Sequence, residues 1–467
     1  MSAPSLERIP LTPELLRLAE ALRGEGGRPV LVGGWVRDCL LGIPHSKDFD
    51  LEVFGMDPGV LKRVLGRFGP VHSVGRHFGV LKLSTREGEY DVSVPRRESK
   101  TGKGHKGFWV TPDPDMTFEQ AAARRDFTIN AMGFGLLENA FLDPYGGWQD
   151  LQARLLRHVG PAFGEDPLRV LRAMQFAGRF RLTIVPETVA ICRAQNLTEL
   201  PRERVWEEVR KLLLQAARPS EGLRYARTLG VLDIFPDLGR LEALGAGAEG
   251  VRPWERTLAV VDEAARLRGA DAGADLALLL AALSHELGRT EPGRAGSPYD
   301  AELAQAALAP TEAWLAQITN ELHVPRRVLP LVRCLPQVQA LHARRDALPP
   351  GALPRLAMHV PLAELARLST ALERALSGSP DAPAAGWLAG RARKDGVWEK
   401  PLAPLLQGRH LIALGLLPGP HMGPLLERAY ELQLDGRLAT AAAAQDWARE
   451  QVAAGAVEPR PDSKPAR

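Results

Sequence analysis

Residues 29–54 read PVLVGGWVRDCLLGIPHSKDFDLEVF, a pattern that predicts a strand, a tight turn, a short helix and a second strand. The apolar first strand runs into Gly33 and Gly34, and the short helix after them ends at Gly42. Two glycines between a strand and a helix let the backbone approach a phosphate group. The free N–H groups at the start of the helix add positive potential, as does Arg37. The turn is therefore a candidate phosphate site, with a plain tight turn as the alternative.

The second strand alternates strictly between acidic and apolar residues, so Asp48, Asp50 and Glu52 share one face. Acidic residues are uncommon in strands, and like charges on one face repel each other unless a cation lies between them. Carboxylate oxygens suit Mg²⁺, which prefers a few carboxylates together with substrate phosphates. Asp48 and Asp50 are therefore the predicted catalytic residues and metal ligands. The alternative is a solvated edge strand.

A short connection separates the glycine turn from the acidic strand, so both can reach the same edge of a sheet. Together they describe a triphosphate held beside paired metal ions. This arrangement serves the attack of a hydroxyl group on phosphorus, because one ion lowers the pKa of the nucleophile and the other stabilises the leaving oxygen.

Two further motifs follow in the chain, Arg124-Arg125-Asp126-Phe127-Thr128-Ile129-Asn130 and Glu165-Asp166-Pro167-Leu168-Arg169-Val170-Leu171-Arg172. With Gly33-Gly34-Trp35-Val36-Arg37-Asp38 and Asp48-Phe49-Asp50 they form an ordered set. This set resembles the class II tRNA nucleotidyltransferase (CCA-adding enzyme) and bacterial poly(A) polymerase family. The resemblance is close from about residue 28 to 240 and patchy beyond.

The resemblance implies roles for individual residues. The implied nucleotide-binding residues are Gly33, Gly34, Arg37, Arg125, Asp126, Asp166, Arg169 and Arg172. Among them Arg125 would contact the nucleotide, while Asp126 and Asn130 would hold the ribose and the local backbone. The alternative for residues 124–130 is a basic cap on a buried segment.

Asp166 and Arg169 lie at the start of a predicted helix, where both side chains can reach one planar group. A carboxylate accepts a hydrogen bond from an exocyclic amine, and a guanidinium donates to a ring nitrogen or carbonyl oxygen. This pair suits cytosine and adenine and rejects uracil and guanine. The resemblance implies this base-reading role, and an intrahelical ion pair is the alternative. Gln175 stands where several close relatives have arginine, so it is left out of the site.

Residues 96–108 read RRESKTGKGHKGF and predict a mobile basic loop rather than a packed element. Relatives that add only CC have a shortened loop in this region, so its presence favours a protein that can add the terminal A. A solvated surface loop is the alternative. Asp91, on the strand before the loop, is a weaker candidate for a third carboxylate, since some relatives have an apolar residue there.

Strand-like segments are confined to the first third of the chain, at 29–32, 49–54, 79–84 and 90–94, and helical spacing dominates from residue 166. The predicted fold is an α+β head with a DNA polymerase β-like nucleotidyltransferase sheet, followed by an all-α neck, body and tail. The predicted domains are the head (1–150), a neck with the base-reading helix (151–240), a degenerate HD-like body (241–385), a tRNA-binding helical tail (386–456) and a disordered end (457–467).

Residues 283–288 read LSHELG and resemble the His-Asp core of a metal-dependent phosphohydrolase. Glu286 replaces the expected aspartate, and Arg256 stands where that family has a histidine. A cation in place of a ligand opposes metal binding. The body is therefore predicted to be an inactive remnant that serves packing and RNA support.

The 467 residues carry 59 Lys and Arg against 56 Asp and Glu, a net charge of +3 that excludes a histone-like or an acidic solvating protein. The three cysteines, Cys39, Cys192 and Cys334, are odd in number and far apart, which favours a reduced compartment without disulfides. With no leader pattern and no long apolar run, the chain is predicted to be cytoplasmic, with no membrane association and no protein partner implied.

These observations predict template-independent addition of C and A to the 3′ acceptor end of tRNA from CTP and ATP, with Mg²⁺ as cofactor and pyrophosphate as product. The alternatives are a specialist that adds only A or only CC, a poly(A) polymerase, an HD-type phosphohydrolase and a non-catalytic RNA-binding module. Nothing in an acidic strand helps to bind a polyanion without metal, which disfavours the last of these.

Overall fold

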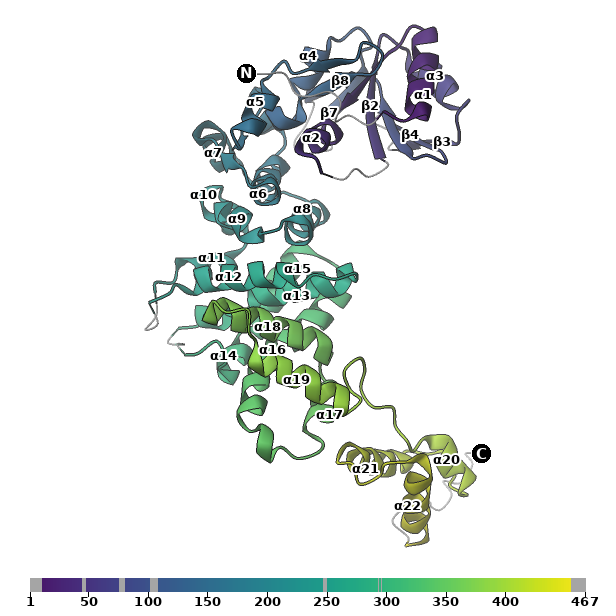
Figure 1. The fold of residues 1–467 in the computed structure, drawn as a ribbon, viewed down its shortest axis with the longest axis vertical. Coiled ribbons are helices and arrows are strands. Elements are labelled where there is room, and N and C mark those ends of the chain that lie inside the picture. Colours follow the sequence, from purple (N-terminus) through teal and green to yellow (C-terminus); the bar gives the residue numbers. More distant parts are fainter. Residues whose placement is uncertain are drawn as a thin grey trace, which may run out of the picture. The chain divides into compact units, whose positions relative to one another are not determined.

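The computed structural model describes residues 11–43, 48–74, 80–100, 108–246, 250–292, 294 and 296–454. It divides into two compact units, Met1–Ile234 and Phe235–Arg467. The first unit combines a sheet with helices and the second is helical, which confirms the predicted fold class (Figure 1). Among the described residues, none of the helices is long and apolar enough to cross a membrane.

A seven-stranded sheet lies at the centre of the first unit, in the order β3-β4-β5-β2-β1-β8-β9. Its strands are β1 Arg28–Val32, β2 Asp48–Phe54, β3 Val71–Val74, β4 Val80–Ser84, β5 Glu89–Ser93, β8 Gly133–Gly135 and β9 Ala140–Leu142. Strands β2 and β5 pair in parallel, and the other neighbours are antiparallel. The four predicted strands are confirmed, with ends that differ by at most one residue; Gly79 lies outside the described residues.

The helices of the first unit surround this sheet and continue beyond it. They are α1 Pro13–Gly24, α2 Gly34–Leu41, α3 Pro58–Leu65, α4 Phe118–Ala122, α5 Gly147–Gln152, α6 Leu168–Phe180, α7 Pro186–Arg193, α8 Arg202–Gln215, α9 Pro219–Leu223 and α10 Tyr225–Thr228. Helices α1 and α3 pack together at the sheet (Figure 1). Helix α2 begins after Gly33 (φ +73°) and ends at Gly42 (φ +68°), as predicted. Both glycines adopt backbone conformations that other residues rarely tolerate.

The two faces of β2 differ as its alternation predicts. Phe49, Leu51 and Val53 are buried. The ring of Phe49 stacks on that of Tyr90 at 5.0 Å between centroids and lies 5.4 Å from that of Trp35 on α2. The opposite face carries the acidic residues.

Two predictions about the head were wrong. Residues 96–100 and 108–112 form an antiparallel ribbon, β6 Arg96–Lys100 with β7 Phe108–Pro112, rather than a loop. The remainder of the predicted loop, 101–107, lies outside the described residues. A further short strand, β11 Thr183–Ile184, pairs in parallel with β10 Leu155–Leu156, so strands are not confined to the first third. Pairs of two residues are too short to show a periodic pattern.

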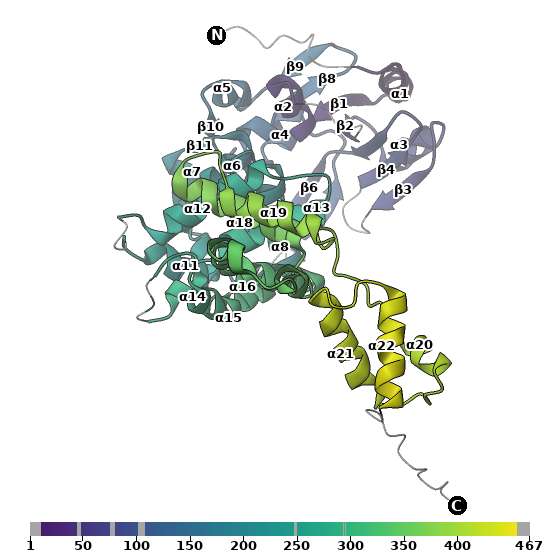
Figure 2. The same cartoon turned by 60° about the horizontal axis from the view of Figure 1, so that its bottom comes forward.

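The described part of the second unit contains helices and no strands. They are α11 Pro236–Ala243, α12 Pro253–Arg266, α13 Ala272–Ser284, α14 Ala301–Ala306, α15 Leu308–Ile318, α16 His323–Ala343, α17 Ala352–Ala357, α18 Leu362–Ser377, α19 Pro383–Lys394, α20 Gly408–Ala413, α21 Met422–Leu434 and α22 Ala441–Ala453. Helix α13 is buried along most of its length and packs against α12, α16 and α18. Helices α20, α21 and α22 gather around a small core of their own (Figure 2). The predicted domain limits stay predictions, and 457–467 lies outside the described residues.

Helices α6 and α9 cross at two glycines, which yields a test of the packing. A Cβ added at Gly178 would lie 2.5 Å from Leu212 Cδ1 and 2.9 Å from the backbone nitrogen of Gly222. Because the backbone must shift to make room, Gly178→Ala is expected to destabilise the first unit by about 1–3 kcal/mol. Gly24→Ala is the matched control, since a Cβ there has open space. It should change stability by less than about 0.5 kcal/mol. Equal melting temperatures of the two variants by calorimetry would contradict the crossing.

The three cysteines are free and buried. Burial raises the pKa of Cys39 and of Cys192 to about 12, and it also raises the pKa of Cys334. At pH 8 the ionised fraction of a thiol of pKa 12 is about a thousandfold smaller than that of an ordinary cysteine. The native protein should therefore react very slowly with Ellman's reagent. In urea, three thiols per chain should react. A rapid single-thiol reaction of the native protein would show that one of these sites is open.

Candidate active site

A cleft of about 440 Å³ opens on the acidic face of the sheet in the first unit. Its lining residues are Val32, Asp50, Leu51, Glu52, Val80, Asp91, Ser93, Val94, Arg96, Ala121, Arg124, Arg125 and Arg169. The lining brings together predicted site residues from three different motifs: Asp50 on β2, Arg125 after α4, and Arg169 on α6. Four arginines and three carboxylates therefore converge on one concavity.

The parallel pairing of β2 with β5 sets the acidic side of the cleft. Asp50 lies opposite Asp91 in the register, so the predicted third carboxylate does stand beside the pair on β2. Partial desolvation raises the pKa of Asp50. Arg125 offsets this effect in part, whereas the neighbouring charges of Asp91 and Asp48 add to it. A carboxylate in these surroundings is more stable when a cation lies nearby.

This donor set fits a divalent ion. The groups are carboxylate oxygens, which Mg²⁺ prefers, and their mutual repulsion favours a cation between them. Across the described part of the chain, no group of three or more acidic, histidine or cysteine side chains converges closely enough to hold an ion by itself. An ion at Asp48 and Asp50 would therefore share its coordination with substrate oxygens, as Mg²⁺ does in phosphoryl-transfer sites.

Gly33 lies where the acidic and basic sides of the site meet. A Cβ at this position would lie 2.9 Å from Arg125 Nη1 and 3.9 Å from Asp50 Oδ2. Both the positive φ and the close approach of Arg125 therefore call for glycine here. At Gly34 a Cβ would lie 3.2 Å from Arg37 Nη2, which is tight but less restrictive.

Arg37 is placed differently from Arg125. Its side chain is 3% exposed and does not line the cleft. The guanidinium packs against the rings of Phe176 and Phe180, which stack on each other, at 5.1 and 4.3 Å from their centroids. It also donates to Asp38 at 2.6 and 2.8 Å and to Asn130 Oδ1 at 2.5 Å. Burial lowers the pKa of Arg37, and Asp38 partly restores it. Arg37 thus joins α2 to α6.

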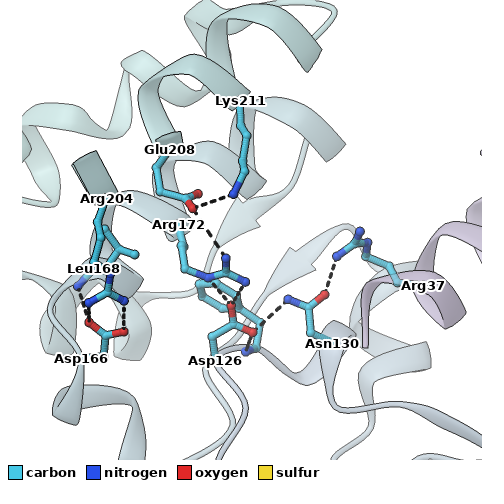
Figure 3. Close-up of polar contacts among 10 residues, drawn as sticks. Arg37, Asp126, Asn130, Asp166, Leu168, Arg172, Arg204, Glu208 and Lys211 are labelled. Carbon is cyan, nitrogen blue, oxygen red and sulfur yellow. Dashed lines mark hydrogen bonds and ion pairs between the residues drawn. The ribbon is translucent and has the colours of Figure 1, made fainter. Parts of the chain in front are cut away.

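The buried carboxylate of Asp126 is the centre of a polar network (Figure 3). Its Oδ1 accepts from Asn130 Nδ2 at 2.9 Å and from the backbone N–H of Phe127 at 2.8 Å, and its Oδ2 accepts from Arg172 Nε at 2.7 Å. Burial alone would raise the pKa of Asp126, but the charge of Arg172 and these hydrogen bonds hold it below its usual range. Asp126 is therefore ionised and ties residues 124–130 to α6.

The same network reaches helix α8. Arg172 lies 3.7 Å from Glu208, which also pairs with Lys211 at 3.1 Å (Figure 3). Glu208 is almost fully buried. A continuous chain of contacts therefore runs from Arg37 through Asn130, Asp126 and Arg172 to Glu208, across α2, the 124–130 segment, α6 and α8.

The predicted base-reading residues have partners other than each other. Asp166 accepts from Arg204 at 2.7 and 3.2 Å and caps α6 through the backbone N–H of Leu168 at 3.1 Å (Figure 3). Arg169 donates to the backbone carbonyls of Ala162 and Arg124, each at 2.7 Å. Asp166 and Arg169 therefore do not form the intrahelical ion pair that was the alternative prediction. Each of them instead contacts residues outside α6.

Sequence reasoning placed residues 151–240 in a helical neck but did not predict the contacts of helix α8 within it. Arg204 and Glu208, one turn apart on α8, complement Asp166 and Arg172. The i, i+4 spacing of opposite charges was visible, but it is equally typical of a solvated helix face. Only the tertiary packing of α8 on α6 distinguishes the two cases.

The HD-like segment of the second unit contains a buried ion-pair cluster. Arg256 donates to Glu286 Oε1 at 2.7 and 2.8 Å, and Arg289 lies 3.2 Å from the same oxygen. His285 is 3% exposed, and its Nδ1 lies 2.7 Å from the carbonyl oxygen of Ala282. Burial lowers the pKa of His285. Guanidinium groups therefore neutralise the glutamate that stands at the place of the expected metal ligand.

Two family models match the chain. The Poly A polymerase head domain matches residues 30–157, and the Probable RNA and SrmB-binding site of polymerase A matches residues 181–241. The matched head contains Gly33, Asp48, Asp50 and Arg125.

Named relatives and solved structures agree with these models. The chain is 40% identical to the Multifunctional CCA protein of Xylella fastidiosa (strain M12), over 65% of this chain and 72% of that protein. It is 37% identical to that of Xanthomonas oryzae pv. oryzae (strain MAFF 311018), over 85% and 96%. The fold is similar to that of the Bacillus stearothermophilus CCA-adding enzyme in complex with CTP, with a TM-score of 0.62 and 22% identity over 95% of this chain and 99% of that one. It is also similar to that of the Thermotoga maritima CCA-adding enzyme complexed with tRNA, with a TM-score of 0.57 and 19% identity over 96% of this chain and 97% of that one. The chain belongs to the class II tRNA nucleotidyltransferase family, which comprises CCA-adding enzymes and bacterial poly(A) polymerases.

Proposed function

We propose that the chain adds C and A to the 3′ end of tRNA without a nucleic-acid template, using CTP and ATP. The observation that carries the proposal is the acidic face of β2, where Asp50 lines a cleft together with Arg125 and Arg169, and Asp48 lies two residues before Asp50 on the same face. In the reaction the terminal ribose oxygen attacks the α-phosphorus of the nucleotide. A new P–O bond forms as the bond to the β-phosphate breaks, and pyrophosphate leaves with that electron pair.

Members of this family are metal-dependent nucleotidyltransferases, and Mg²⁺ is the proposed ion, held by Asp48 and Asp50. When bound, it supplies a lower pKa for the attacking hydroxyl and positive charge beside the leaving pyrophosphate. Asp91, opposite Asp50 in the register, adds negative potential to the same side of the cleft. The turn at Gly33 and Gly34 leaves room for phosphate oxygens beside Arg125.

The arginines divide into two groups in this proposal. Arg125 lines the cleft and would bind the triphosphate or the sugar directly. Arg37 donates to Asn130, and Arg172 donates to Asp126. These two arginines would therefore act on the nucleotide indirectly, by holding α2, α6 and the 124–130 segment together around it. The ionised form of Asp126 maintains these contacts, because it accepts from both Asn130 and Arg172.

Asp166 and Arg169 are proposed to select cytosine and adenine. A carboxylate offers about four lone-pair positions, so Asp166 can accept from an exocyclic amine while it still accepts from Arg204. Arg204 would thereby orient the base-reading carboxylate. Arg169, which also lines the cleft, would donate to the ring.

The second unit is proposed to support RNA rather than to catalyse. The buried pairing of Arg256 with Glu286 supports the reading of an inactive HD-like remnant. Helices α20 to α22 would contact tRNA, and the phosphate contacts would weaken steeply with salt. A cytoplasmic location, to which the free, buried cysteines are suited, is part of the same proposal.

Asp50→Asn separates the catalytic role from folding. The pKa of Asp50 is raised in the folded chain, so its ionised form destabilises the fold at pH values above that pKa. In metal-free buffer at pH 7.5 the variant should therefore melt at the same temperature as the wild type or higher. Its nucleotide incorporation should fall by about a hundredfold or more, because a metal ligand is lost. Glu87→Gln, which removes a carboxylate exposed outside the cleft, should leave both unchanged. Full incorporation by Asp50→Asn would refute the assignment.

An incorporation assay tests the proposed function itself. A tRNA that lacks CCA is incubated with CTP alone, ATP alone or both, and the products are resolved to single nucleotides. We expect CC from CTP alone, no extension from ATP alone, and a complete CCA end from both. Addition of A only to a tRNA that already ends in CC would identify an A-adding specialist, and an end that stops at CC would identify a CC-adding one. Long A tails on unstructured RNA would identify a poly(A) polymerase.

A further inference from the structure

Glu52 is the third acidic residue on the catalytic face of β2, and no role has been given to it so far. Its side chain is 14% exposed and lines the cleft with Asp50. Its partners in the register are Val30 on β1 and Ser93 on β5, neither of which carries a charge. Beyond it on the same face, Phe54 packs edge-on against Phe118 of α4 and closes that end of the sheet. The carboxylate of Glu52 therefore has no charged residue opposite it on either neighbouring strand.

The carboxylate of Glu52 forms an ion pair with Arg125. Glu52 Oε2 lies 3.5 Å from Arg125 Nη2, longer than the 2.7–2.9 Å typical of a charge-assisted hydrogen bond. Arg125 Nη1 lies against Gly33, and Arg125 Nε is buried without a hydrogen-bond partner. The guanidinium is therefore restrained by charge at Nη2, while its buried Nε–H has no hydrogen-bond acceptor.

Arg125 has a second carboxylate within reach. A Cβ at Gly33 would touch both Arg125 Nη1, at 2.9 Å, and Asp50 Oδ2, at 3.9 Å, so these two groups adjoin the same point. Arg125 also lowers the pKa of Asp50 through its charge. Within the described residues, however, Arg125 forms its ion pair with Glu52 and not with Asp50. Two carboxylates thus compete for one guanidinium, and Glu52 holds it.

This competition matters because Asp50 is a proposed metal ligand. A carboxylate paired with a guanidinium offers fewer free lone pairs and less negative charge to a cation. If Arg125 moved onto Asp50, the metal and the phosphates would each lose a partner. We propose that Glu52 is a positioning residue that holds Arg125 away from Asp50, so that Asp50 stays free for the metal and Arg125 faces the phosphates. This inference rests on the proposed function.

The test is equilibrium binding of CTP to the full chain in Mg²⁺ buffer, without tRNA, by isothermal titration calorimetry. Glu52→Gln keeps the shape of the side chain and removes its charge, and it should weaken binding by about tenfold, as is typical when the partner of a metal-site ligand is lost. Glu52→Asp keeps the charge and should lose less than about threefold. Glu25→Gln breaks a pair of the same kind, with Arg67 at 2.7 Å, outside the cleft, and should bind like the wild type.

Repeating the substitution of Glu52 in the Asp50→Asn variant separates a role in positioning Arg125 from a merely structural effect. In Asp50→Asn the competing carboxylate has no charge, so adding Glu52→Gln should change CTP binding by less than about twofold. In incorporation assays Glu52→Gln should raise the Mg²⁺ concentration for half-maximal rate about tenfold, with the rate at saturating Mg²⁺ within about threefold of the wild type.

Two results would overturn the role of Glu52. One is CTP binding by Glu52→Gln that equals that of the wild type, and the other is an equal loss in both backgrounds. A wild-type chain that binds no CTP would instead contradict the proposed function and would leave the ion pair of Glu52 unexplained. Melting curves of each variant check that the first unit stays folded.

Discussion

The repulsion between carboxylates on one face of β2 is the constraint on which the site depends. Asp48 and Asp50 alternate with buried apolar residues, and the parallel strand β5 adds Asp91 directly opposite Asp50. Partial desolvation makes the charge of Asp50 costly, as its raised pKa shows. A face of this kind is stable in its ionised form only with cations beside it. The arginines of the cleft supply part of that charge, and a metal–nucleotide complex is proposed to supply the rest.

The residues around the cleft include buried charges that are not proposed to contact substrate, and each of them is paired. Asp126 is buried but satisfied by Arg172, Asn130 and a backbone N–H. Arg37 is buried but packed against the rings of two phenylalanines and bonded to Asn130. Paired in this way, buried charges cost little as long as every partner remains, whereas loss of one partner is expensive. The head motifs and the helices α6 and α8 are therefore held as one structure inside the first unit.

Local pattern was enough for the parts of the site that depend on local geometry. The alternation in residues 48–54 predicted which side chains share a face, because side chains alternate across any strand. The glycines around α2 predicted its limits, because few other residues tolerate a positive φ. The ordered motifs, through family resemblance, predicted a set of nucleotide-binding residues, of which Arg125 and Arg169 line the cleft.

What the pattern did not predict depends on partners that are distant in sequence. Arg37 looked like a phosphate ligand, yet its side chain is buried against the rings of Phe176 and Phe180. The ribbon of β6 and β7 was not predicted, because β6 is rich in charged residues and its partner strand β7 follows only after a connection. Arg204 and Glu52 were visible as charges, but their partners, Asp166 and Arg125, are brought to them only by folding.

The most direct test of the central claim is the position of the metal. Crystals of the protein grown with CTP and Mn²⁺ would be measured at a wavelength where manganese scatters anomalously. The account predicts an anomalous peak bound by the carboxylate oxygens of Asp48 and Asp50 and by the phosphates of CTP, with Arg125 on the phosphate side. A nucleotide bound with its phosphates away from β2, or manganese bound only elsewhere, would contradict it.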